Sequence, residues 1–285
     1  MNKIGIMQGR LTPSLSRGIQ FFPFGVGEWQ EEFIKAEKLG LYDIDFDFDL
    51  ERYEENPLWT KKGRKEIKDV IKKTGVRVEH ITADFFMRRP FFRVDKKIRK
   101  ENENTFVKLM KYAEEIGTYN IEMPILDNSS MKTDDEQKIF IESMSRCLAK
   151  APKNMTISFE GDLSPDSFLK LLKEINNPAV KIVYDIGNRT GLGYSPENEI
   201  LLLYKHITHI HIKDKKFQGT TVPLGTGSAD FEKIFSVLAS INFKGNFILQ
   251  VARGEDRNEE KKVLKDIRFI DDLIQKYLQK KKVVV

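Results

Sequence analysis

Residues 156–188 read TISFEGDLSPDSFLKLLKEINNPAVKIVYDIGN, and this stretch carries the pattern that decides the fold. Two short apolar runs, residues 156–160 and 180–185, flank the segment DSFLKLLKEINN, whose apolar residues recur at helical spacing. Short apolar runs bounded by turn residues are typical of buried strands. Because a helix between two strands lets them pair in parallel, the stretch predicts a strand–helix–strand unit.

The same unit recurs along the whole chain. Helices are expected to end at Gly40, Gly75 and Gly117, since glycine favours the left-handed cap that closes a helix. Eight strands alternating with eight helices predict an α/β fold, a single (β/α)8 TIM barrel formed as one domain over residues 1–285, and a doubly wound open sheet is the alternative. The expected strands are residues 3–8, 41–48, 76–82, 120–124, 156–160, 180–185, 207–213 and 246–251.

Composition indicates a soluble globular protein, with 40% hydrophobic and 32% charged residues in 285. The net charge of +5 is spread over helical segments in which Lys and Arg alternate with Asp and Glu, so we expect no nucleic-acid partner. Cys147 is the single cysteine, which excludes an intrachain disulfide. The N-terminus lacks the features of a secretion signal and no apolar run could span a bilayer, so we expect a cytoplasmic location and no membrane partner.

The carboxyl ends of barrel strands share one mouth, so residues that end the strands are candidates for chemistry. Glu160, Asp185, His211 and Gln250 end the last four expected strands. Two carboxylates, an imidazole and an amide oxygen suit a divalent ion such as Mn, Co, Mg or Zn. Each residue alone has a structural alternative, because a strand-end carboxylate also caps helices or pairs with lysine.

The segment ITHIHIKD, residues 207–214, alternates with a period of two. This alternation places His209 and His211 on the inward face, with His211 nearer the mouth and His209 a hydrogen-bonded core residue one layer deeper. Lys213 shares that face and is predicted to hold a substrate oxygen, with a structural ion pair as the alternative. Asp214 opens the following loop and is a candidate substrate-binding residue.

Motifs near these positions resemble those of the xylose isomerase-like barrel superfamily, the group of sugar isomerases, sugar-phosphate epimerases and endonuclease-type relatives. They occur in the order and spacing of that family over almost the full length, and the opening GIMQGRL resembles a subgroup described as sugar-phosphate isomerases or epimerases. The resemblance implies metal ligands at Glu160, Asp185, His211 and Gln250. The motifs are SFEGD, YDIGN, HIHIKD, PLGTGSADF and GNFILQVARG.

Two residues depart from the family pattern. Gln250 stands where the epimerases and isomerases generally carry Glu, and an amide cannot accept a proton as a base. In related epimerases the glutamates of the fifth and eighth strands resemble an opposed pair of bases, so this pair is incomplete here. Asn188 stands where sugar-binding members often have a histidine, which predicts altered hydrogen bonding to substrate.

The resemblance and the ligands together imply proton abstraction next to a carbonyl, with Glu160 as the base and an enediolate intermediate. We expect either one-base aldose/ketose isomerisation, or epimerisation in which Glu122, His80 or Asp84 supplies the second acid. These three residues are placed near the third and fourth strand ends. A structural role inside the barrel is the alternative for Glu122 and His80.

The substrate is expected to be a sugar or a sugar phosphate. In PLGTGSADF, residues 223–231, glycines free the backbone and Ser228 is predicted to cap the next helix, which favours phosphate binding, with a tight structural loop as the alternative. Arg10 and Arg253 are candidate contacts for a phosphate or carboxylate. The aromatic segments at residues 21–29 and 83–92 predict walls or a lid over the sugar, or the interface of a homodimer.

Three other functions compete with the isomerase or epimerase. A metabolite-binding barrel without turnover is kept open by Gln250, and a metal-dependent lyase or dehydratase is kept open by the shared enediolate chemistry. An endonuclease IV-like nuclease is disfavoured, because its site of several metals needs more histidines than the four in this chain.

Overall fold

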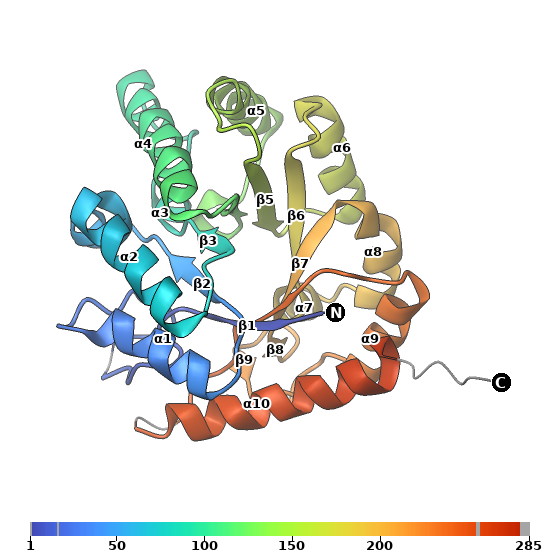
Figure 1. Cartoon of the computed structure of the whole chain (residues 1–285). Coiled ribbons are helices and arrows are strands. Elements are labelled where there is room, and N and C mark those ends of the chain that lie inside the picture. The colour runs from blue at the N-terminus through green and yellow to red at the C-terminus, as the bar shows by residue number, and fades with distance from the viewer. Residues whose placement is uncertain (1, 16, 255–256, 280–285) are drawn as a thin grey trace.

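A computed structural model describes residues 2–15, 17–254 and 257–279. Eight parallel strands form a closed barrel, and the long helices surround it (Figure 1). This confirms the (β/α)8 TIM barrel and excludes the open sheet. The barrel strands are β1 (Ile4–Met7), β2 (Ile44–Asp47), β3 (His80–Thr82), β4 (Asn120–Ile125), β5 (Thr156–Gly161), β6 (Val180–Asp185), β7 (Ile207–Ile212) and β10 (Phe247–Leu249).

The barrel closes between its first and last strands. β1 pairs with β10 through Ile6 and Leu249, and with β2 through Ile6 and Ile44, so no strand edge is left open in the barrel. One irregularity lies between β6 and β7, where Ile182 pairs with Ile207 but the next residue, Val183, pairs with His209. The additional residue on β7 is Thr208, and such bulges re-aim the side chains beside them.

The helices follow the predicted order. Gly40, Gly75 and Gly117 end the first helices with φ of 72°, 74° and 84°, which confirms the predicted left-handed caps. Two short helices, α3 (Phe85–Arg88) and α7 (Ile186–Gly191), were not predicted, nor was the hairpin of β8 (Asp214–Lys215) and β9 (Thr221–Val222). The longer helices are α1 (Glu28–Lys38), α2 (Lys61–Thr74), α4 (Lys96–Ile116), α5 (Asp134–Leu148), α6 (Pro165–Ile175), α8 (Pro196–Leu203), α9 (Phe231–Ser240) and α10 (Glu259–Leu273), the last continued by a π turn over Ile274–Leu278.

The apolar core lies between the strands and the helices. Two aromatic residues point outward at the end of β2: Phe46 packs edge-on against Trp29, and Phe48, directly after the strand, stacks on Trp59 and Phe85. Phe159 of β5 packs in the same way on Phe140 of α5. Each buried ring contributes about 1.5–3 kcal/mol to stability.

The two aromatic segments have different positions. The side chains of Phe85, Phe86, Phe91 and Phe92 are at most 3% exposed, so the prediction that residues 83–92 form a lid or a subunit interface is wrong for these rings. Phe21, Phe22 and Phe24, in the loop after β1, instead line a surface hollow of about 540 Å³. The aromatic rings of the first segment are therefore the ones placed to contact another molecule.

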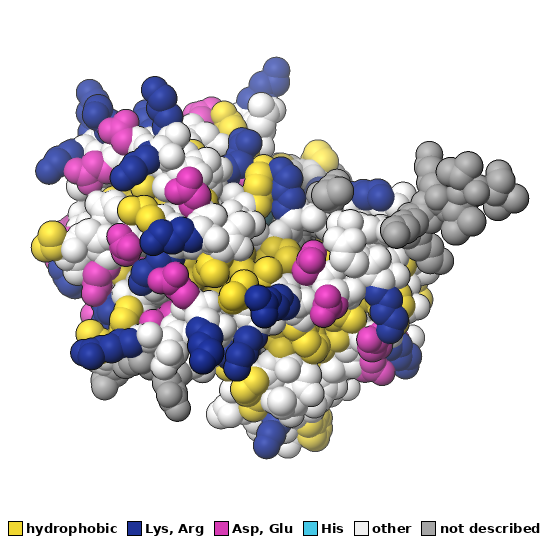
Figure 2. Space-filling model, turned by 60° about the horizontal axis from the view of Figure 1, so that its bottom comes forward, with side chains coloured by type: hydrophobic (Ala, Val, Ile, Leu, Met, Phe, Trp, Pro, Cys, Tyr) yellow, Lys and Arg dark blue, Asp and Glu magenta, His cyan; other side chains and the backbone are white. Residues whose placement is uncertain are grey.

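The interior of the barrel is unusually polar. Asp43, directly before β2, and Asp45 and Asp47 of β2 alternate with the outward apolar residues and are fully buried, where barrels usually carry branched apolar side chains. On the outer surface, basic and acidic side chains are interspersed over the face shown in Figure 2. None of the described helices has the length and apolar character needed to cross a membrane.

Candidate metal centre

Three of the four predicted ligands come together at the mouth of the barrel. Glu160, Asp185 and His211 end β5, β6 and β7 and are 6%, 1% and 0% exposed. Nδ1 of His211 lies 3.8 Å from Oε2 of Glu160 and 4.0 Å from Oδ2 of Asp185, and the three ligand atoms lie within 4.8 Å of one another. The predicted convergence of β5, β6 and β7 on one point is therefore present in the fold.

The fourth ligand, Gln250, directly follows β10. Its backbone N–H donates to Ile212 of β7 at 3.0 Å, and Ile248 pairs with His211. Period-two alternation from Ile248 then turns the Gln250 side chain toward the barrel interior. This side chain is buried beside the strand that carries His211.

The donor atoms of these residues fit a cation. Nδ1 of His211 and Oε1 of Gln250 are buried, and neither has a hydrogen-bond partner among the residues that the structure describes. Leaving a buried polar atom unsatisfied costs about 1–3 kcal/mol. A divalent ion bound by oxygen and nitrogen ligands would satisfy both atoms, so the residues present fit such an ion.

Asn188 and Lys213 link the ligands into one network. Asp185 begins helix α7 and accepts the Asn188 N–H through Oδ1 at 2.6 Å. The Asn188 side chain donates from Nδ2 to Oε1 of Glu160 at 2.5 Å, and its Oδ1 accepts from Nζ of Lys213 at 3.4 Å. Lys213 pairs with Oδ2 of Asp185 at 2.8 Å, which is the ion-pair alternative for this lysine.

Electrostatics distinguish the roles of these groups. Burial, together with the charges of Asp185 and Glu122, raises the pKa of Glu160 well above its usual value. Burial lowers the pKa of Lys213, but the charges of Asp185 and Glu160 outweigh it and raise that pKa. Lys213 is therefore a fixed cation, whereas Glu160 is a carboxyl with increased basicity.

Arg10 and Arg253 are bonded to backbone carbonyls. Arg10 donates from Nε to Val251 O at 3.0 Å and from Nη1 to Ile19 O at 2.5 Å. Arg253 donates from Nε to Ile19 O at 3.0 Å, from Nη1 to Thr12 O at 2.9 Å and also to Gly9 O. Both guanidinium groups therefore fix the loop after β1 to the end of β10.

Asp214 fixes the loop after β7. Its Oδ2 accepts from Gly227 N at 2.8 Å and its Oδ1 from Ala229 N at 3.2 Å. A Cβ at residue 227 would lie 2.1 Å from Oδ1 of Asp214, so this position requires glycine. The predicted helix cap at Ser228 is wrong: Asp230 caps α9 by accepting from Lys233 N, while the Ser228 hydroxyl accepts from Phe217 N.

The three candidates for a second acid have different positions. His80 begins β3, so the expectation that it lies at a strand end is wrong; its ring stacks on His209 with centroids 3.9 Å apart. Glu122 is fully buried beneath His211, at 3.1 Å from Nε2 of that ring. Asp84 lies two residues after β3 and directly before α3, at the carboxyl end of the strand, and it is half-buried.

Sequence reasoning missed the buried carboxylate that β2 places beside His211. Asp45 lies 3.3 Å from Nε2 of His211, and Oδ2 of Asp45 has no hydrogen bond to any residue in the described ranges. The alternation of aspartates with apolar residues in DIDFDFD, residues 43–49, was the signal that could have revealed these inward carboxylates.

Asp84 makes the metal-free protein sensitive to pH. Burial, with the charges of Asp49 and Glu122, raises its pKa from 3.8 to about 8. The folded chain therefore binds one more proton than the unfolded chain between these values, and the contribution of Asp84 to stability is lost as pH rises through about 8. We expect the urea midpoint of wild type to fall between pH 5 and pH 8.5 more steeply than that of Asp84→Asn. Asp69→Asn, on an exposed face of α2, should match wild type, and equal slopes in all three proteins would contradict the assignment.

A closed parallel barrel with carboxylates and an imidazole gathered at the ends of neighbouring strands defines a TIM-barrel protein with a candidate metal centre at its mouth. The chain belongs to the xylose isomerase-like TIM barrel family, whose family model matches residues 33–273. The family resemblance seen in the motifs is thereby confirmed.

Individual proteins agree with this assignment. The chain is 26% identical over 275 residues to a proposed L-ribulose-5-phosphate 3-epimerase, SgbU, of Haemophilus influenzae, with 91% of each chain covered. It is 25% identical over 257 residues to the L-ribulose-5-phosphate 3-epimerase UlaE of Escherichia coli, covering 85% of this chain and 88% of that protein. Among solved structures, the IolI protein with a bound zinc atom has a TM-score of 0.73 at 17% identity, covering 96% of this chain and 99% of the other.

Proposed function

We propose that this chain is a divalent-metal-dependent isomerase or epimerase that acts on a sugar or sugar phosphate through an enediolate. The observation that carries the proposal is the convergence of Glu160, Asp185 and the unpartnered Nδ1 of His211 at the barrel mouth. The names of the relatives SgbU and UlaE support a sugar-phosphate epimerase, and the zinc atom in the IolI structure supports a metal in this family.

Glu160, Asp185, His211 and Gln250 would hold the ion. A divalent ion, such as Mn, Co, Mg or Zn, would polarise the substrate carbonyl and stabilise negative charge on its oxygen. Glu160 acts as the base: burial raises its pKa and so increases its basicity, and Asn188 holds Oε1 while Oε2 stays free of that bond. Lys213 supplies a second positive charge for the developing oxyanion.

Protonation of the opposite face of the substrate carbon requires a second acid–base group, because Gln250 cannot accept or donate a proton in this way. Asp84 is the favoured candidate for epimerisation: it follows β3 at the mouth, and a pKa of about 8 keeps it protonated at neutral pH. Without a second acid, Glu160 returns the proton itself and the reaction is an aldose/ketose isomerisation.

A phosphorylated sugar is the favoured substrate, and the support is the shared activity named for SgbU and UlaE. Arg10 and Arg253 would then act by holding the loop after β1 in place, because their guanidinium groups already donate to backbone carbonyls. Asp214 would act likewise on the loop at residues 223–231.

Solvent-deuterium exchange tests the proposal. L-ribulose 5-phosphate and L-ribulose are incubated in D2O with the full chain, with and without added Mn²⁺, and deuterium at the carbon next to the carbonyl is followed by NMR. We expect metal-dependent incorporation, faster for the phosphorylated sugar. Binding of the sugars without incorporation would instead identify a metabolite-binding barrel, and elimination products would identify a lyase or dehydratase.

A further inference from the structure

A second group of donor atoms lies one layer below the metal centre. Asp45, Glu122, His209 and His211 are each fully buried, and one ligand atom from each lies within 4.8 Å of all the others. Nε2 of His211 is 3.1 Å from Oε2 of Glu122 and 3.3 Å from Oδ2 of Asp45, and Nε2 of His209 is 3.5 Å from Oε2 of Glu122. We call these four residues the lower cluster.

These three separations are close to those of neighbouring ligands around a tetrahedral ion. Bonds of about 2.1 Å from zinc to nitrogen and oxygen place neighbouring ligands about 3.4 Å apart in a tetrahedron. Although the atoms are this close, Nε2 of both histidines, Oδ2 of Asp45 and both oxygens of Glu122 form no hydrogen bond within the described part of the chain.

The contacts of His209 leave one of its ring nitrogens facing a carboxylate. Oγ1 of Thr208, the additional residue of the β7 bulge, lies 3.0 Å from Nδ1 of His209 and donates to Ile182 O at 3.2 Å. Nε2 of His209 lies 3.5 Å from Oε2 of Glu122 and has no hydrogen-bond partner among the described residues. A cation bound between these two atoms would satisfy both of them.

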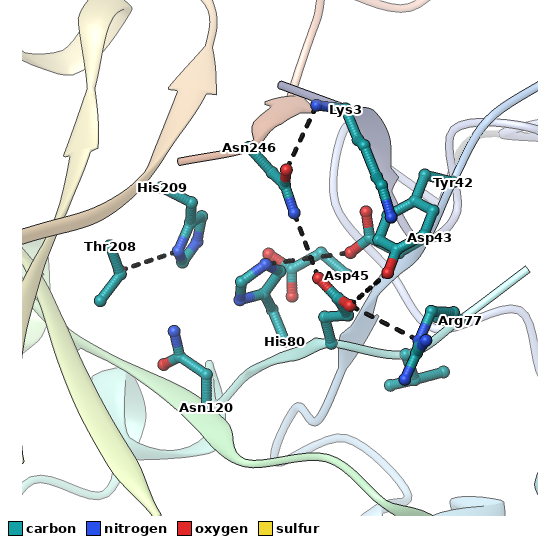
Figure 3. Close-up of polar contacts among 12 residues, drawn as sticks. Lys3, Tyr42, Asp43, Asp45, Arg77, His80, Asn120, Thr208, His209 and Asn246 are labelled. Atoms are coloured by element: carbon teal, nitrogen blue, oxygen red, sulfur yellow. Dashed lines mark hydrogen bonds and ion pairs between the residues drawn. The ribbon is translucent and has the colours of Figure 1, made fainter. Parts of the chain in front are cut away.

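Hydrogen bonds orient two residues of the lower cluster, and a surface hollow lies near it. Thr82 donates to Oδ1 of Asp45 at 3.0 Å, and Thr208 orients His209, as partners of metal ligands commonly do. A hollow of about 640 Å³ at the amino-terminal end of the barrel is lined by His80 and Asn120, among others. Figure 3 shows His80 between Asp43 and His209, so one residue that lines this hollow also stacks on a member of the lower cluster.

We propose that Asp45, Glu122, His209 and Nε2 of His211 bind a second divalent cation of the zinc type. His211 then bridges the two ions through its two nitrogens, and its ring proton is released to solvent. The charges balance: Asp45, Glu122, Glu160 and Asp185 neutralise two divalent ions, and Lys213 neutralises the bridging imidazolate. The site is a property of the chain whichever sugar is processed.

A single ion at the mouth is the competing arrangement, with the Nε2–H of His211 donating to Glu122. That arrangement explains a carboxylate beside His211, because such pairs orient metal-bound histidines. It provides no partner for Nε2 of His209, which faces the same carboxylate at 3.5 Å.

Metal stoichiometry tests the proposal. The full chain is loaded with excess Zn²⁺, unbound metal is removed, and bound zinc is measured by inductively coupled plasma mass spectrometry. We expect two zinc ions per chain in wild type, one in His209→Asn and one in Asp185→Asn. The side chain introduced by His209→Asn keeps a hydrogen-bond donor for Thr208 but has no atom in the place of Nε2. His206→Asn is the matched control, because His206 lies on the turn before β7 and away from both clusters, and this variant should still bind two ions.

The outcomes separate the two arrangements without a measurement of turnover. The lower site is overturned if wild type and His209→Asn each bind one ion. It is also overturned if both proteins bind two ions. If His209→Asn does not fold, Glu122→Gln answers the same question with an isosteric change and should also retain one ion. A failed exchange experiment with sugars alongside two bound ions would reject the proposed function and leave the lower site supported.

Discussion

Replacing Glu160 by Gln should lower deuterium exchange into the substrate by about 10²–10⁴-fold, the usual contribution of a positioned general base. The amide keeps the size of the side chain and an oxygen for the ion, but it cannot accept the proton. The rate is measured at saturating Mn²⁺ so that weaker metal binding does not account for the loss. Asp162→Asn, two residues away and paired with Lys132 at the surface, is the matched control and should exchange like wild type.

Asp84→Asn separates abstraction from reprotonation. If Glu160 removes the proton and Asp84 delivers one to the opposite face, this variant should still exchange deuterium but form the epimer about 10²-fold more slowly. If deuterium incorporation survives in Glu160→Gln but disappears in Asp84→Asn, then Asp84 is the base that removes the proton and Glu160 is the acid that returns it.

The fold could be predicted from the sequence because periodicity records which face of an element is buried. The stretch from residue 156 to 188 shows the apolar runs of two strands and the helical spacing between them. The observed bounds of the strands and the helix lie within a few residues of the predicted ones. The short helix α7 was missed because six residues, IGNRTG, are too few to show a helical period.

The meeting of Glu160, Asp185 and His211 could be predicted because each of these residues lies at the end of a strand, and parallel strands end at one mouth. The lower cluster could not, because its residues lie inside strands, where a polar residue is ordinarily a hydrogen-bonded core residue. His209 was predicted to be such a residue, and it is buried with Nδ1 bonded to Thr208, whereas its Nε2 has no partner among the described residues. The register shift that places Thr208 beside this ring is not visible in the sequence.

Glu199→Gln should destabilise the protein by about 3–5 kcal/mol, because it leaves the buried Arg189 without its carboxylate. Arg189 and Glu199 are both 3% exposed; Glu199 accepts from Arg189 and from the Tyr184 hydroxyl, and Arg189 also donates to the carbonyls of Gly161 and Leu163. These bonds join α7 and α8 to the ends of β5 and β6, so they hold Asn188 and Asp185 in the candidate metal centre. Glu197→Gln, the same exchange two residues earlier, removes the charge from a pair with Lys233 near the surface and should cost at most about 1 kcal/mol. Urea unfolding of the full chain measures both free energies, and a difference below 1 kcal/mol between the variants would show that this buried ion pair does not fix the helices around the site.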